Sequence, residues 1–139
     1  MRVLKCFPLI LMLAVFTMLS NFGFPSDAEA YSSITSRKNG VTVDVKPRKF
    51  APGQPVKFEV RMNTHTVDLA EDMAVVSTLR DDQGREYRPV SWQGAPPGGH
   101  HRKGVLEFPA LDGSTKSVTL VIRNVGGVPE RAFEWKVER

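Results

Sequence analysis

The sequence predicts an all-β protein: a seven-stranded immunoglobulin-like β-sandwich with Greek-key pairing, preceded by an N-terminal signal peptide. Apolar and polar residues alternate with period two in several short stretches, which is typical of strands with one buried face. Turn-forming residues separate these stretches at short spacing, and no helical period of useful length occurs in residues 31–139. Seven short strands in about a hundred residues fit a sandwich of two sheets.

Residues 1–30 are predicted to be the signal peptide. Arg2 and Lys5 form a short positive segment, and the apolar run 9–19 has the length of a signal-peptide core but is too short for a comfortable membrane span. Small residues stand at the two positions that a signal peptidase reads, which predicts cleavage after Ala30. The alternative is an uncleaved N-terminal anchor.

One domain is expected after cleavage, with a periplasmic or extracellular location and no membrane span. Residues 31–40 are expected to be a flexible N-terminal segment, and residues 41–139 to form the sandwich. The single cysteine, Cys6, precedes the apolar run and would be removed with the signal, so a lipid anchor is not expected. The exported domain must then be stable without a disulfide.

The expected strands differ in how regular their alternation is. The clearest alternation occurs in residues 41–46, 56–62, 118–123 and 133–138. Less regular candidates are residues 74–80, 86–92 and 105–108. The segment 81–84 reads as a hairpin turn and not as a calcium loop, because the further oxygen ligands of such a loop are missing.

The net charge of +4 indicates little about function, because the two signs are interleaved along most of the chain. Basic residues cluster only as pairs, at Arg37-Lys38 and Arg102-Lys103, with no aromatic platform for single-stranded nucleic acid. Nucleic-acid binding is therefore not expected. The excess charge is interpreted as a solvated face that weakly favours anionic envelope polymers.

No enzyme is expected from the motifs of the chain. It has no Gly-x-Ser-x-Gly elbow, no phosphate-binding glycine loop and no His-Glu-x-x-His helix, and the mature part has no cysteine. The constellation that catalysis requires is therefore absent from the sequence.

The histidines mark the candidate site. All three lie in the turn-rich segments 63–68 and 98–102, neither of which reads as regular structure. Loops on a rigid scaffold often carry binding chemistry, and imidazole is the commonest metal ligand. Because successive strands of a sandwich run up and down, its connections alternate between two ends. Counting strands places one set of residues at the same end: His65, Asp68, Asp72, His100, His101 and the Gly126-Gly127 loop.

Three hypotheses compete for that end. In one, copper or zinc is bound, with Asp72 and the soft Met73 as further candidate ligands beside His65, Asp68, His100 and His101. In another, the same residues only satisfy buried backbone groups of the loops. In the third, the loops recognise a protein or envelope component through Trp92, His101 and Arg102. The sequence thus predicts an exported, non-catalytic binding or accessory module, with metal binding as the alternative.

Two segments carry a family resemblance. Thr64-His65-Thr66-Val67-Asp68-Leu69 and Gly98-Gly99-His100-His101-Arg102 resemble a family of small exported prokaryotic proteins of unknown function. The resemblance covers most of the mature chain and implies an exported β-rich domain without an assigned activity. More distantly, Pro52-Gly53-Gln54-Pro55 is similar to the strand entry of periplasmic copper-handling β-sandwiches. The chain departs from those proteins, because Tyr31 offers no N-terminal histidine and the methionine-rich copper stretch is lacking.

Overall fold

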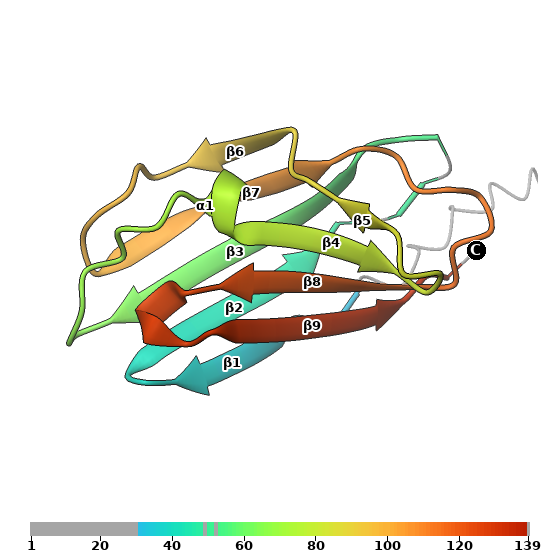
Figure 1. Ribbon diagram of the computed structural model, residues 1–139. Helices are drawn as coiled ribbons and strands as arrows, with labels where there is room; N and C mark the ends of the chain where they lie inside the picture. The colour runs from blue at the N-terminus through green and yellow to red at the C-terminus, as the bar shows by residue number, and fades with distance from the viewer. Residues whose placement is uncertain (1–30, 49, 52, 139) are drawn as a thin grey trace, which may run out of the picture.

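Two antiparallel β-sheets make up the protein in its computed structural model, which describes residues 31–48, 50–51 and 53–138 (Figure 1). Sheet A has the strand order β1-β2-β3-β7-β6, and sheet B has the order β5-β4-β8-β9. The strands of sheet A are β1 Ile34–Lys38, β2 Val41–Pro47, β3 Val56–Thr64, β6 Ser91–Gly94 and β7 His101–Phe108. Those of sheet B are β4 Ser77–Asp81, β5 Glu86–Tyr87, β8 Ser117–Arg123 and β9 Glu130–Lys136. The only helical segments of the described chain are α1, Met73–Val76, and the short 3-10 turn η1, Val125–Gly127.

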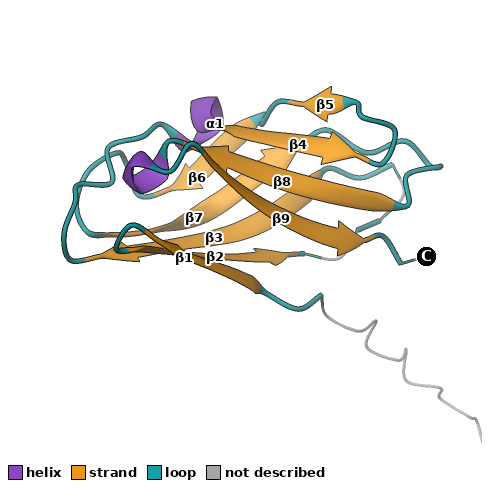
Figure 2. Ribbon diagram, turned by 60° about the horizontal axis from the view of Figure 1, so that its bottom comes forward, coloured by secondary structure: helices purple, strands orange, loops and turns teal. Residues whose placement is uncertain are grey.

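The two sheets bury one hydrophobic core between them, as two layers (Figure 2). Alternation along β2 and β3 directs every second side chain inward, as the sequence predicts for these strands. The ring of Phe58 lies 5.8 Å from that of Phe108 in sheet A and 5.5 Å from that of Trp135 in sheet B. Burying one large apolar side chain of this kind contributes roughly 1.5–3 kcal/mol, so this core is the main source of stability.

The described residues form nine strands and not the seven that the sequence predicts. One addition is β1, which lies in the segment 31–40 that was expected to be flexible. Asn39 and Gly40, with φ of 50° and 71°, make the two-residue turn that folds β1 onto β2. The prediction failed because Ile34 is the single large apolar side chain that β1 presents on its inner face. The predicted signal peptide, residues 1–30, lies outside the described residues.

The second addition comes from the stretch 86–92, which was predicted to be one strand and is two. Strand β5 pairs with β4 in sheet B, whereas β6 pairs with β7 in sheet A. Pro89 lies between them, and a residue without an N–H cannot continue a strand ladder. The predicted strand 74–80 likewise begins as the helical turn α1, and the predicted strand 105–108 is only the second half of β7.

The strand directions place four connections at one end of the molecule, here called the top end, which lies at the left in Figure 1. It contains the β1–β2 turn and the segments 65–72, 95–100 and 124–129. The opposite end, called the bottom end, contains the turn 82–85 and the loop 109–116. Within the described part of the chain, no helix is long and apolar enough to cross a membrane.

Candidate functional site

The top end brings together the segments that counting the strands predicted to share one end. Segments 65–72 and 95–100 are joined by backbone hydrogen bonds, from Leu69 N to Gly99 O at 2.9 Å and from Gly98 N to Leu69 O at 2.8 Å. The η1 turn reaches the β1–β2 turn, where Asn39 donates to the carbonyl of Gly126 at 3.4 Å. The predicted juxtaposition is therefore confirmed. The split into β5 and β6 did not disturb it, because the chain crosses between the sheets without reversing direction.

Asp68 braces the two long loops against each other. Its Oδ1 accepts a hydrogen bond of 2.6 Å from the backbone N–H of Gly99. Gly98 and Gly99 have φ of 113° and 79°, a region that residues with a Cβ seldom adopt, so the sharp approach of this loop depends on glycine. The carboxylate of Asp68 is thus already engaged in holding a backbone turn.

Arg102 lies beneath the same loops and is 2% exposed. Its Nη1 donates to the carbonyls of Leu69 at 3.0 Å and Glu71 at 2.7 Å, and its Nη2 donates to Ala95 at 3.2 Å. Burial lowers the pKa of the guanidinium, an effect that nearby carboxylates partly oppose. Arginine stays charged across ordinary pH, so this clamp on three carbonyls is permanent.

Trp92 supports Arg102 from below. The guanidinium carbon lies 5.8 Å from the centre of a Trp92 ring, a cation–π distance. The indole N–H donates to the carbonyl of Ala95 at 2.9 Å. Gly104 gives the ring its space, because a Cβ there would come within 2.6 Å of two indole carbons.

The three candidate contact residues therefore do not share one surface. Arg102 is buried and Trp92 is partly buried, so both act by positioning the loops. The sequence predicts Arg102 as a contact residue, whereas in the structure its Nη atoms face inward to backbone carbonyls. His101 is exposed and keeps its place at the surface.

The histidine side chains take little part in bracing the loops. All three are exposed, and the rings of His65 and His101 lie edge to face with centres 5.8 Å apart. His101 shares a hydrogen bond of 2.9 Å between its Nδ1 and Oδ1 of Asn63, whereas His100 contributes its backbone carbonyl to Thr64 N. His101 belongs to β7, so the expectation that every histidine lies outside regular structure is wrong for it.

The further metal-ligand candidates have other roles. Asp72 caps α1 by accepting a hydrogen bond of 3.0 Å from Ala74 N. Met73 is fully buried in the core, so its sulfur does not reach the surface. Across the described residues, no group of three or more histidine, cysteine, aspartate or glutamate side chains has a geometry suited to a metal ion.

Sequence reasoning missed a second buried arginine, Arg131 of β9, which is 1% exposed. Its guanidinium donates to the carbonyls of Lys38 at 2.9 Å and of Val125 and Val41 at 3.3 Å, and to Ser36 Oγ at 3.0 Å. It thereby ties β1 and η1 to sheet B. A signal existed, because Arg131 stands on the same alternation phase as the core residue Phe133.

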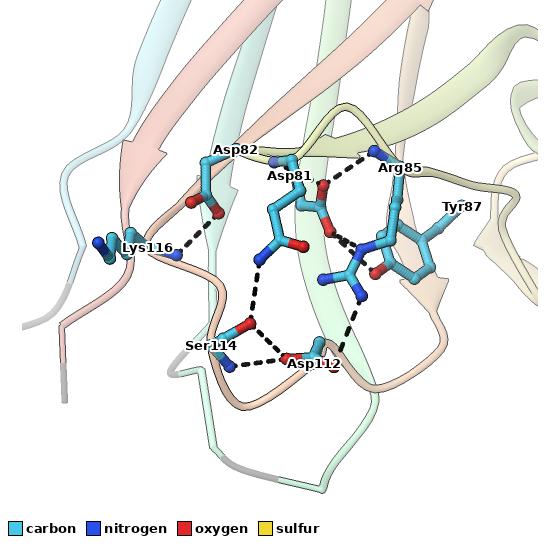
Figure 3. Close-up of polar contacts among 8 residues, drawn as sticks. Asp81, Asp82, Arg85, Tyr87, Asp112, Ser114 and Lys116 are labelled. Carbon is cyan, nitrogen blue, oxygen red and sulfur yellow. Dashed lines mark hydrogen bonds and ion pairs between the residues drawn. The ribbon is translucent and has the colours of Figure 1, made fainter.

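The bottom end is held by a buried carboxylate (Figure 3). Asp81 accepts hydrogen bonds from Gln83 N and Arg85 N at 2.9 Å, from Arg85 Nε at 2.7 Å and from the Tyr87 hydroxyl at 3.1 Å. Burial by itself raises the pKa of Asp81, but these hydrogen bonds outweigh it and hold the pKa below its ordinary value. The segment 81–84 is a hairpin turn, as predicted.

Neighbouring loops extend this network. Asp82 accepts a hydrogen bond of 2.9 Å from Lys116 N, which lowers its pKa. Asp112 accepts from the hydroxyl and N–H of Ser114, which lowers its pKa as well. These contacts close the bottom end within the chain itself.

A shallow depression lies on the outer face of sheet A, next to the top end. It is lined by Arg61, Asn63, His101, Arg102 and Lys103. Alternation along β7 turns the Arg102 side chain to the inner face, so the other four side chains give the depression its chemistry. Comparison of the chain with known protein families, curated proteins and solved structures gives no match.

Proposed function

We propose that the protein is an exported, non-catalytic binding module whose histidine-bearing top end contacts a protein or envelope partner. The observation that carries this proposal is that the top end is braced without the imidazoles of His65 and His100. Asp68, Arg102 and the loop backbone make the holding contacts, while His65 and His100 remain exposed. A rigid frame that presents unused polar side chains is what a recognition surface requires, because little ordering entropy is lost on binding.

The proposed fold assignment is an immunoglobulin-like sandwich with added strands. The order β2-β3-β7-β6 corresponds to the A-B-E-D sheet of such domains, and β5-β4-β8-β9 corresponds to a C′-C-F-G sheet. Strand β1 is then an addition at the edge beside β2. Domains of this architecture often use the loops at one end for recognition, which supports the proposed role of the top end.

Export and the absence of catalysis are parts of the same proposal. Export is supported by the signal-like composition of residues 1–30. A non-catalytic role is supported by the surroundings of the histidines. Among the described residues, no histidine hydrogen-bonds a serine or a carboxylate, whereas a hydrolytic site needs such a relay.

Site-specific photo-crosslinking in cells that make the protein tests the proposal. A photoreactive amino acid is placed at position 65 or 100 of the top end, and at the matched exposed position Ala110 of the bottom end. Discrete adducts at positions 65 and 100, with none at 110, are expected. The same adducts at all three positions, or none at the top end, would overturn the proposal.

The second candidate function is binding of copper or zinc by the top end. The observation that favours it is the proximity of the His65 and His101 rings, whose centres lie 5.8 Å apart. His100 and Asp68 are the remaining candidate ligands, although Asp68 already bonds Gly99 N. A ligand that binds only the folded state raises the melting temperature by mass action.

Thermal unfolding of the metal-free protein, titrated with zinc and then with copper, separates the two functions. Under the partner-binding proposal, neither metal raises the melting temperature by a specific amount. A rise of several degrees that disappears in both His65→Ala and His101→Ala would establish the metal site instead.

A further inference from the structure

The positive charge of the protein is distributed unevenly between its two broad faces. On the outer face of sheet B, acidic and basic side chains balance: Arg80, Arg123 and Lys136 against Glu86, Glu130 and Glu134. On the outer face of sheet A, basic side chains are in excess: Arg37, Lys46, Lys57, Arg61 and Lys103 against Asp44, Glu59 and Glu107. The face of sheet A is therefore the one that attracts anions.

Within sheet A, the excess lies next to the top end. Near the bottom end, Lys57 pairs with Glu107 at 3.2 Å, and Glu59 pairs with Arg48 at 3.2 Å. Near the top end, the side chains of Arg61 and Lys103 form no hydrogen bond or ion pair with any described residue, and neither does the side chain of Arg37. Three unpaired cations of this face thus lie next to the top end, and Lys46, opposite Glu59, is a further one nearer the bottom end.

The strand register sets two of these cations against each other. Arg61 of β3 lies directly opposite Lys103 of β7. Like charges at opposed positions of an antiparallel pair destabilise the sheet. The neighbouring carboxylate, Asp44 of β2, hydrogen-bonds the Thr35 hydroxyl and makes no ion pair with Arg61. An anion lying over Arg61 and Lys103 would relieve this repulsion.

The shape of the face suits an extended ligand. Arg61 lines two shallow depressions: the one described above, and a second that it shares with Ser33, Asp44, Val45, Lys46 and Glu59. The two together cross β2, β3 and β7 without an enclosed cavity. No phenylalanine, tyrosine or tryptophan lines either depression, and His101 is the single ring there, so the face offers no run of rings on which successive bases could stack.

The second depression also has a definite chemistry. Asp44 and Glu59 place carboxylates beside the cations Arg61 and Lys46. A carboxylate repels phosphate but accepts hydrogen bonds from hydroxyl groups. A ligand that suits both depressions therefore carries anionic groups and hydroxyl groups in alternation.

We propose that this face of sheet A binds a linear envelope polymer of polyol units joined by phosphate diesters. Arg61 and Lys103 hold one phosphate, His101 and Asn63 border it, and the carboxylates of Asp44 and Glu59 accept hydroxyl groups of the adjoining unit. The inference deepens the proposed binding function by naming the class of its ligand, and it uses the sheet face beside the histidine loops.

Calorimetric titration of the processed protein with poly(glycerol phosphate) tests this inference. The double variant Arg61→Gln/Lys103→Gln removes the proposed phosphate contacts, and Arg88→Gln/Lys136→Gln is its charge-matched control. Arg88 and Lys136 are exposed and have no ion-pair partner among the described residues, so the control removes the same charge elsewhere. The sheet A variant is expected to bind about tenfold more weakly, with a shallower salt dependence, because two phosphate contacts are lost. The control is expected to bind within about twofold of the unmodified protein, because it loses no phosphate contact and its lower net charge weakens only the long-range attraction.

The inference would be overturned by no binding of the polymer, by equal weakening in both double variants, or by binding only to anionic phosphatidylglycerol vesicles. Single-stranded DNA is a further arm, since it carries phosphate diesters on sugars but adds bases for which this face has no platform. DNA binding as tight as that of the polymer would also overturn it. Crosslinking at positions 65 and 100 is a separate readout, so loss of polymer binding with retained crosslinks would leave the proposed function standing.

Discussion

Buried charged side chains hold both ends of the molecule, arginines at the top end and a carboxylate at the bottom end, so the charges have opposite sign. At the top end, the guanidinium of Arg102 donates to three backbone carbonyls. At the bottom end, the carboxylate of Asp81 accepts from two backbone N–H groups, from Arg85 Nε and from the Tyr87 hydroxyl. Both side chains stand on the inward phase of their strands, where an apolar residue would ordinarily pack.

The difference in sign decides how each end responds to its surroundings. Arginine remains charged at any pH that the protein meets, so the hydrogen bonds of the top-end clamp do not change with pH. The carboxylate of Asp81 accepts these hydrogen bonds fully only while it is ionised, so the bottom end is sensitive to acid. The top end therefore combines a frame that is constant with pH with histidine side chains that stay exposed.

The largest expected effect comes from removing the top-end clamp with Arg102→Met. Methionine fills much of the volume but donates no hydrogen bond, so the carbonyls of Leu69, Glu71 and Ala95 lose their buried donor. The free energy of unfolding is expected to fall by about 3 kcal/mol, because leaving buried polar groups unpaired costs roughly 1–3 kcal/mol each. Urea unfolding followed by tryptophan fluorescence measures the change.

The neighbouring substitution Lys103→Met is the control for that measurement. Lys103 is exposed on the same strand, so a change of less than about 0.5 kcal/mol is expected. Equal effects of the two substitutions would show that the clamp on the loops is not what Arg102 contributes.

The next largest effect is expected at the bottom end with Asp81→Asn. An asparagine oxygen can still accept from the backbone N–H groups, but its NH₂ group cannot accept from Arg85 Nε or from the Tyr87 hydroxyl. A loss of roughly 2 kcal/mol at neutral pH is expected. Asp112→Asn, which alters an exposed carboxylate of the same network, serves as the comparison and should cost less.

The pH dependence of the stability difference between the unmodified protein and Asp81→Asn tests the comparison of the two ends more sharply. The pKa of Asp81 in the folded protein is below its ordinary value of 3.8. Its stabilising contribution is therefore complete above about pH 4 and is lost as the pH falls through the folded pKa, since the unfolded chain takes up the proton first. Unfolding measured from pH 7 down to pH 2.5 should show the unmodified protein converging on Asp81→Asn. For Arg102→Met, a gap to the unmodified protein that stays constant over the same range is expected, and a gap that closes there would contradict the proposed contrast.

The alternation of the sequence was enough to predict β2, β3 and β8, because their inner residues are mostly apolar and their outer residues are polar apart from Val121 of β8. Counting the strands as running alternately up and down was enough to predict which loops meet at the top end. The buried charges were not predicted, since Arg102, Asp81 and Arg131 all lie just outside the strands that alternation predicted, and the shared phase of Arg131 and Phe133 was not used. The partners of the two arginines are mainly backbone carbonyls from distant segments, and such groups leave no mark in the side-chain sequence. The partners of Asp81 lie within six residues of it.

The smallest expected effect concerns the histidines themselves. It decides whether the top-end loops are held without the imidazoles, which would leave these side chains free to contact a partner. His65→Ala and His100→Ala should each change the free energy of unfolding by less than about 0.5 kcal/mol, because neither exposed ring makes a hydrogen bond within the described chain. Asp68→Ala, at the same end, should cost about 1–2 kcal/mol because Gly99 N loses its acceptor. If the histidine variants were instead as destabilised as Asp68→Ala, the imidazoles would be part of the loop bracing. The top end would then resemble the bottom end, with its polar side chains used up in holding the fold and none left for a partner.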